Sequence, residues 1–129
     1  MASELRVDTL KDSSGNNSVG MAYVAGGSAK AWVNYDCAST TPRDSFNVAS
    51  LSDNGTGYFT TTFTNNMNND DYSIPTSSND VNASATLYGL NAHTYATGSV
   101  QCDSFEANPS TVQQIDSNHN HIAIFGDLA

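Results

Sequence analysis

Two histidines near the C-terminus have a spacing suited to metal binding. His119 and His121 are separated by one residue, in the segment Asn118-His119-Asn120-His121. On a β-strand, alternate side chains face the same side, so the two imidazoles would point together. Three copies of this strand around an axis would supply six imidazole nitrogens, enough for an octahedral transition-metal site. The alternatives are a solvated polar strand and a pH-sensitive contact. The sequence indicates no other cofactor.

Polar loops supply the candidate receptor-binding residues, since binding residues occur disproportionately on loops. The segment 65–72 combines amides, carboxylates and a ring, a suitable set for hydroxyl-rich glycans. We single out Asn68, Asn69, Asp70, Asp71, Tyr72 and, further along the chain, His93. The alternative is that these are only solvated turns.

Trp32 is the single tryptophan. We interpret it as a buried core anchor, the alternative being a stacking platform for a sugar ring.

The sequence does not indicate an enzyme. Its aspartates lie in turn-like settings, as turn chemistry alone predicts. It contains neither Gly-x-Ser-x-Gly, nor His-Glu-x-x-His, nor a phosphate-cradling glycine loop. Cys37 and Cys102 are the only cysteines. We interpret them as small, reduced, buried residues, with a disulfide between them as the alternative.

The amino-acid composition limits which fold classes and which kinds of binding partner are expected. Ser, Thr and Asn make up 45 of the 129 residues, and these residues compete with helix hydrogen bonds, which favours an all-β chain. The net charge of -9 would repel phosphate backbones and anionic membranes, so neither nucleic-acid binding nor lipid-surface binding is expected. No apolar run approaches the ~20 residues that a membrane span needs, so membrane insertion is not expected either. The N-terminus lacks the basic start and apolar block of a signal peptide, which predicts synthesis and use in a cytoplasm.

Strand-like segments separated by turn signals recur along the chain, at the spacing typical of a sandwich. Asp53-Asn54-Gly55-Thr56-Gly57 predicts a tight hairpin turn, because Asn-Gly supplies the positive φ values that such a turn needs. Pro75 indicates an edge strand. We predict no helix. In segment 30–36, Ala31, Val33 and Tyr35 should alternate with Trp32 and Asn34. Segment 45–53 should place Phe46, Val48 and Leu51 near one side and contain a bulge. The expected segments are 3–11, 30–36, 45–53, 57–66, 72–78, 83–90, 94–105 and 118–128.

Large apolar side chains are few, and many expected strands carry Ser, Thr or Ala where a self-sufficient sandwich would carry Val, Ile or Leu. Small cores are usually supplemented by disulfides, metals or oligomerisation. We therefore expect an oligomer. Residues 1–29, which contain Gly20, Gly26 and Gly27, are predicted to form a short attachment and oligomerisation segment, and residues 30–129 the β domain.

Several motifs carry a resemblance to a known family. They are Ala-Lys-Ala-Trp-Val-Asn-Tyr (29–35), Arg-Asp-Ser-Phe-Asn-Val (43–48), Asp-Asn-Gly-Thr-Gly (53–57), the aromatic and Thr-rich 58–63, and the ending 122–129. With these, the chain resembles tail-fibre and virion-appendage proteins of tailed bacteriophages, of the marine and cyanobacterial phage type. The resemblance is weakest over 75–115.

The resemblance implies a homotrimeric virion protein with a small antiparallel β-sandwich. It implies a tail-fibre or spike component that contacts the host surface, through a glycan or a protein. The alternative is a head decoration, head-fibre or collar protein without receptor specificity. Either would join other virion proteins through the N-terminal segment, be made in the host cytoplasm and end in the virion.

Overall fold

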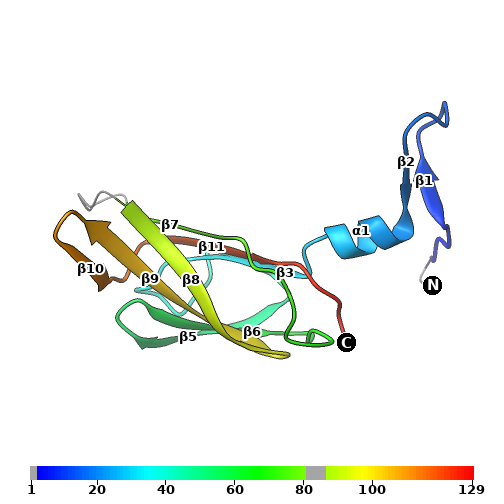
Figure 1. The fold of residues 1–129 in the computed structure, drawn as a ribbon. Coiled ribbons are helices and arrows are strands. Elements are labelled where there is room, and N and C mark those ends of the chain that lie inside the picture. The colour runs from blue at the N-terminus through cyan, green and yellow to red at the C-terminus, as the bar shows by residue number, and fades with distance from the viewer. Residues whose placement is uncertain (1–2, 81–86) are drawn as a thin grey trace.

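A computed structural model describes residues 3–80 and 87–129. This part of the chain is mostly β-structure, with antiparallel strand pairing and one short helix (Figure 1). The all-β prediction is confirmed at this level. The elements in chain order are β1 (Thr9–Lys11), β2 (Ser18–Gly20), α1 (Met21–Gly27), β3 (Ala31–Tyr35), β4 (Asp44–Phe46), β5 (Val48–Gly55), β6 (Tyr58–Phe63), β7 (Thr76–Asn79), β8 (Leu87–Ala96), β9 (Ser99–Asn108), β10 (Thr111–Gln114) and β11 (His119–Ile124).

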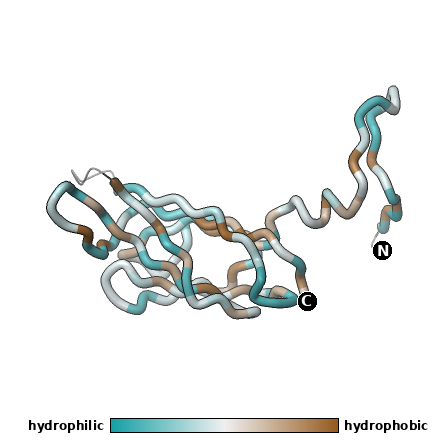
Figure 2. The backbone as a smooth tube through the Cα atoms, in the orientation of Figure 1, coloured by the Kyte–Doolittle hydropathy of each residue, from teal (hydrophilic) through white to brown (hydrophobic). Residues whose placement is uncertain are grey.

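The N-terminal part, residues 3–28, stands away from the rest of the chain and is called the arm below; residues 30–129 are called the body (Figure 1). The arm begins with the β1–β2 hairpin, whose turn is organised by Asp12. The carboxylate of Asp12 accepts hydrogen bonds from the backbone N–H of Ser14 and Asn16 at 3.1 and 2.9 Å. In Figure 2 the tip of this hairpin is hydrophilic, and hydrophobic positions lie nearer the helix.

The prediction of no helix is wrong for residues 21–27, which form α1. Met and Ala are strong helix formers, and three of the first five residues of α1 are of these types. Beyond the helix, Lys30 donates through Nζ to the backbone carbonyls of Ala25 and Ser28. Such a lysine satisfies carbonyls that a helix C-terminus leaves without an internal partner. The sequence interpretation gave more weight to Gly26 and Gly27 than to the helix propensity of the Met and Ala residues before them, and so it missed this helix.

The body contains a four-stranded sheet in the order β4-β3-β11-β7. Strand β3 places Ala31, Val33 and Tyr35 inside and the two residues between them outside, which confirms the predicted alternation. Strand β7 lies at one edge and begins after Pro75. This confirms the edge position that proline indicated, although the strand itself starts later than the expected segment 72–78.

The second sheet of the body has five strands, in the order β10-β9-β6-β5 with β8 paired to β9. The hairpin predicted at residues 53–57 joins β5 to β6. Gly57 adopts φ 75°, and a Cβ there would lie 2.6 Å from the carbonyl oxygen of Ser104, so no other residue fits without a shift. The expected single strand 94–105 is wrong: the chain turns at residues 97–98, between β8 and β9.

The predicted bulge lies between Val48 and Ser50, where the register of β5 against β6 shifts. The expected clustering of Phe46 with Val48 and Leu51 on one side is wrong. Phe46 is 53% exposed, whereas Leu51 is buried. Phe46 belongs to β4 in the four-stranded sheet, and the following residues belong to the other sheet. Of the expected strand 83–90, residues 83–86 lie outside the described residues.

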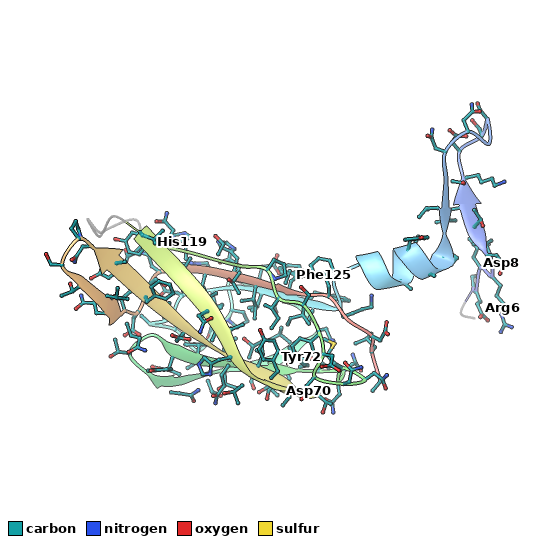
Figure 3. The ribbon with its side chains drawn as sticks, in the orientation of Figure 1. Arg6, Asp8, Asp70, Tyr72, His119 and Phe125 are labelled. Atoms are coloured by element: carbon teal, nitrogen blue, oxygen red, sulfur yellow. The ribbon has the colours of Figure 1, made fainter. Side chains whose placement is uncertain are left out.

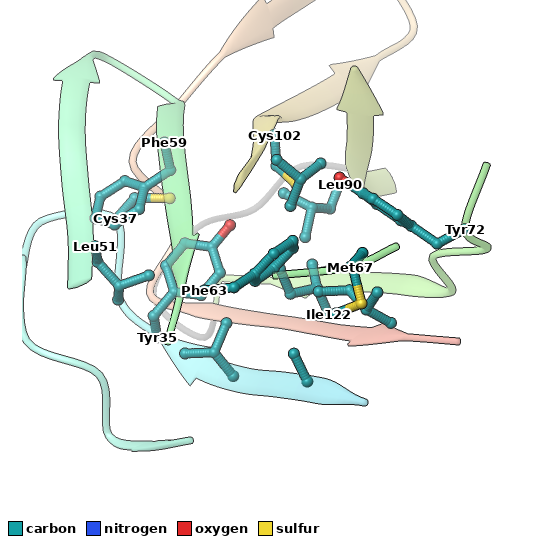
Figure 4. Packing of buried hydrophobic residues seen from close by; sticks show 14 residues of the cluster. Tyr35, Cys37, Leu51, Phe59, Phe63, Met67, Tyr72, Leu90, Cys102 and Ile122 are labelled. Carbon is teal, nitrogen blue, oxygen red and sulfur yellow. The ribbon is translucent and has the colours of Figure 1, made fainter. Parts of the chain in front are cut away.

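Buried side chains from both sheets form a single cluster (Figure 4). The rings of Tyr35 and Phe59 stack at a centroid distance of 4.8 Å, and those of Phe63 and Tyr72 meet edge-on at 6.0 Å. Aromatic pairs in these arrangements stabilise a core beyond the area that they bury. The stacked pair joins Tyr35 of β3, in the four-stranded sheet, to Phe59 of β6, in the five-stranded sheet.

Candidate functional site

Strand register brings four polar residues into one row across the outer side of the four-stranded sheet. Asn34 of β3 pairs with Asp44 of β4 and with His121 of β11, and His121 pairs with Ser77 of β7. Neighbouring strands lie about 4.8 Å apart, so the row crosses all four strands at regular intervals. We call Asp44, Asn34, His121 and Ser77 the polar row.

A second row, next to the polar row, is aromatic and apolar. Trp32 pairs with Phe46 on one side and with Ala123 on the other. The backbone N–H of Ala123 donates to the carbonyl of Pro75 at 3.3 Å, which extends the row to the edge of the sheet. Trp32 is half-buried and faces outward. The interpretation of Trp32 as a core anchor is therefore wrong, because its neighbours Ala31 and Val33 face the core.

The two rows line a shallow groove of about 470 Å³. Trp32, Asn34, Asp44, Ser77, His121 and Ala123 all contribute to its walls. The small side chain of Ala123 leaves space beside the indole of Trp32, since Ala123 is the opposite residue on the neighbouring strand. The groove thus offers an aromatic surface next to a carboxylate, an amide, an imidazole and a hydroxyl.

The amide of Asn34 has an unused acceptor. Its Oδ1 atom is buried and has no hydrogen-bond partner among the described residues. A buried polar atom without a partner is costly and calls for an explanation, such as a ligand. Asp44, by contrast, accepts a hydrogen bond through Oδ1 from the backbone N–H of Ser45 at 2.8 Å. A carboxylate has room for further donors.

His119 and His121 share the outer face of β11, as the spacing predicted, because Asn120 between them is fully buried. His119 Nδ1 lies 2.7 Å from Oδ1 of Asn118. Figure 3 places His119 toward the end of the body far from α1. No group of three or more His, Cys, Asp or Glu within the described residues is placed to hold a metal ion. A metal at His119 and His121 needs further copies of the strand and stays a prediction.

The predicted receptor-binding loop, residues 68–72, contains both exposed and buried side chains. Asn68, Asn69, Asp70 and Asp71 are exposed, but Tyr72 is buried and its hydroxyl is 2.9 Å from the carbonyl oxygens of both Ala96 and Ser99. Burial also raises the pKa of the Tyr72 hydroxyl. Tyr72 therefore holds the loop to the body, while its four predecessors remain available to solvent.

The loop also lies nearer to the arm than His119 does (Figure 3). The backbone N–H of Asn68 donates to the carbonyl of Asp127 at 2.8 Å, which joins the loop to the C-terminal tail. His93 lies elsewhere, on β8 of the five-stranded sheet. Its Nε2 is 3.5 Å from a carboxylate oxygen of Asp103, and its ring meets that of Tyr58 at 6.3 Å. The contacts of His93 are thus distinct from those of the loop.

Both cysteines are free and buried, as the sequence interpretation expected. Burial raises the pKa of the Cys37 thiol and raises that of Cys102 to about 12. Because the thiolate is the reactive form, both are poor nucleophiles. Asn120 donates through Nδ2 to Sγ of Cys37 at 3.2 Å and accepts through Oδ1 from the hydroxyl of Ser117 at 2.7 Å.

Sequence reasoning singled out the histidines and missed the role of Asn120, which is the buried centre of this hydrogen-bond network. It also missed Asn34, Asp44 and Ser77. The alternation of residues 31–35 already placed Trp32 and Asn34 on one side, opposite the apolar residues. That alternation alone could have identified Trp32 and Asn34 as neighbours on one outer face. The cross-strand neighbours of these two residues required the sheet order.

Comparisons with protein-family models, with curated protein sequences and with solved structures each give no match. The resemblance of residues 29–74 to phage appendage proteins therefore stays a prediction. Among the described residues, no helix has both the length and the apolar character needed to cross a lipid bilayer.

Proposed function

We propose that this chain is a structural component of a bacteriophage virion: a small homotrimeric tail-fibre or spike protein. In this proposal the arm joins the three copies and attaches them to other virion proteins, while the body contacts the host surface. The observation that carries the proposal is the arm, whose apolar side chains are exposed within a single copy of the chain.

Helix α1 has seven residues, none of them buried. Helices this short are marginal in water unless tertiary packing supports them. Tyr23 on the helix and Leu5 before the hairpin are both 80% exposed, and Leu10 and Val19 of the hairpin are also exposed. These features support an arm whose apolar residues are covered in an assembly, as the resemblance implies.

We infer that the two sheets of the body form a small antiparallel β-sandwich. The shared cluster of buried side chains supports this arrangement. We also infer a binding role for the body rather than catalysis. Cys37 and Cys102 are both buried, so neither thiol is presented to a substrate as a nucleophile. A head decoration, head-fibre or collar protein would use the same arm without needing a ligand-binding face. The groove beside Trp32 favours the host-contacting alternative.

The first test is the solution mass of the chain, by light scattering after size exclusion. The proposal predicts about three times the chain mass of 13.6 kDa. Tyr23→Asp, which puts a charge on α1, is expected to dissociate the trimer. Val112→Asp is the matched control, because Val112 is similarly exposed, at 72%, but lies on β10 of the body. A monomeric wild-type chain would contradict the proposal.

Two further measurements separate the alternatives. Purified trimer is expected to compete with phage for adsorption to host cells if the body contacts the host, and not to compete if the chain is a decoration or collar protein. A chelator is added in a parallel mass measurement. Dissociation by the chelator would assign a structural metal to His119 and His121, the only metal-ligand pair that the sequence indicated.

A further inference from the structure

We propose that the groove on the outer side of the four-stranded sheet binds a neutral saccharide, with one sugar ring stacked on Trp32. This inference deepens the proposed host contact and rests on it for its biological setting. It assigns the receptor-binding face to β3, β4, β7 and β11 rather than to the loop 68–72.

The aromatic row provides the surface for a sugar ring. Trp32 is half-buried and lines the groove, so part of its indole is open to a ligand there. Ala123 opposite it is too small to fill the space. The C–H-rich face of a pyranose is apolar and flat, and packs on aromatic rings in the same way as other apolar surfaces. Binding sites commonly combine such an apolar wall with a few placed polar groups.

The polar row provides hydrogen-bonding groups for the hydroxyls of the same ring and its neighbours. Asp44 accepts, Asn34 both donates and accepts, and His121 and Ser77 can do either. Their regular spacing across the strands, about 4.8 Å, distributes these groups along a line beside Trp32. A linear array of mixed donors and acceptors suits a chain of sugar rings, which carries hydroxyls on both edges.

The unused acceptor of Asn34 points to a missing donor. Its Oδ1 atom is buried without a partner among the described residues. The terminal torsion of asparagine is broad, so a small rotation can turn the amide toward the groove. A ligand hydroxyl would then supply the donor that this atom lacks. Water could also serve, but a sugar hydroxyl delivers the donor together with the ring that stacks on Trp32.

Charge selects a neutral saccharide. Of the described residues that line the groove, Asp44 is acidic and none is a lysine or arginine, and the chain carries a net charge of -9. The nearby Arg43 is engaged, since its Nη2 lies 3.2 Å from the carboxylate of Asp36. Sulfated, phosphorylated or sialylated glycans would therefore meet electrostatic repulsion from Asp44 and from the acidic chain as a whole. Neutral hexose chains would not.

Because Trp32 is the only tryptophan, its fluorescence reports on the groove alone. The trimer is screened against a microarray of neutral glycans, and the best are titrated in solution, together with cellotetraose, maltotetraose and a sulfated tetrasaccharide. We expect a saturable change in Trp32 emission with at least one neutral glycan and none with the sulfated one. Asn34→Ala and His121→Ala should each weaken binding about three- to tenfold, the effect expected for loss of a hydrogen bond to a ligand.

The matched control is Tyr58→Ala, which removes an exposed ring from the five-stranded sheet and should leave the affinity unchanged. Trp32→Phe is followed by calorimetry and should bind more weakly. The proposal is overturned if no neutral glycan binds, or if the sulfated probe binds equally well. It is also overturned if acrylamide cannot quench Trp32 in the trimer, because the face would then be covered by a second copy.

These outcomes are distinguishable from failure of the proposed function. A trimer that blocks phage adsorption equally well with wild-type Trp32 and with Trp32→Ala would retain the host-contacting role and exclude this groove. A monomer that binds neutral glycans would retain the groove and exclude the trimeric assembly.

Discussion

The side-chain amide of Asn47 pairs with the backbone of Asn65 in both directions. Its Oδ1 accepts from the N–H of Asn65 at 2.7 Å, and its Nδ2 donates to the carbonyl of Asn65 at 3.1 Å. Asn47 has φ 56° and lies where the chain leaves β4 in one sheet and enters β5 in the other. Its amide thus replaces a pair of ladder bonds at the point where the backbone changes sheets.

These contacts predict that two substitutions of Asn47 should lower the stability of the protein by different amounts. Asn47→Ala should lower the free energy of unfolding by about 2–3 kcal/mol, since it removes these hydrogen bonds and places alanine at a left-handed φ. Asn47→Gly should cost less, because glycine adopts this φ freely. Urea denaturation measures both, with the exposed Asn16→Ala as control. Equal costs for Ala and Gly would show that backbone conformation contributes nothing at this site.

Phe105 lies directly over Gly89 on the neighbouring strand. A Cβ at Gly89 would come within 2.2 Å of the ring. Gly89→Ala should therefore destabilise the protein by about 1–3 kcal/mol, the usual range for overpacking. The double variant Gly89→Ala with Phe105→Ala should recover part of that loss relative to the sum of the single effects. Gly26→Ala, with open space around it, is the control. Additive effects in thermal unfolding would contradict the contact.

Neighbouring residues of the His119-Asn120-His121 segment should differ in their contribution to stability, because Asn120 is buried and His121 is exposed. Asn120→Ala leaves Ser78, Ser117 and Cys37 without the partner that they share, and should cost about 2–4 kcal/mol in denaturant unfolding. His121→Ala, one residue further and exposed, should change stability by no more than about 0.5 kcal/mol. If His121→Ala were as destabilising as Asn120→Ala, the assignment of burial along β11 would be incorrect.

Stability should fall at alkaline pH because of the buried thiols. Folding raises the pKa of Cys102 from its ordinary value of 9.0 to about 12. Above about pH 9 the unfolded chain therefore loses a proton that the folded chain keeps. The unfolded state then binds fewer protons, so the free energy of unfolding decreases as pH rises.

The contribution of Cys102 is complete below its unfolded pKa and is lost as the pH approaches its folded pKa. Urea unfolding measured from about pH 8 to about pH 11 should show this decline, and Cys102→Ala should reduce its slope. Thiol labelling by an aromatic disulfide reagent near neutral pH should be slow until denaturant is added. Rapid labelling of the native protein would contradict the burial of both thiols.

Much of the local structure was accessible from sequence. The alternation of residues 31–35, the turn at 53–57 and the edge strand after Pro75 each depend on a period-two pattern or on the backbone preference of a few adjacent residues. The helix at 21–27 was missed, because its glycines and small residues resemble those of an irregular segment. The turn at residues 97–98 was missed because the residues on both sides of Thr97-Gly98 are strand-like, so that one continuous strand was predicted across it.

The sequence by itself therefore determined the all-β class, several strands and the shared side of the two histidines, whereas its interpretation of Trp32 as a core anchor was wrong. Only the tertiary structure decided which strands are neighbours. Asp44, Asn34, His121 and Ser77 form a row because β11, near the C-terminus, pairs with both β3 and β7. Pairing between distant segments depends on the packing of the whole core, and a shift of one residue would turn each of these side chains to the other face.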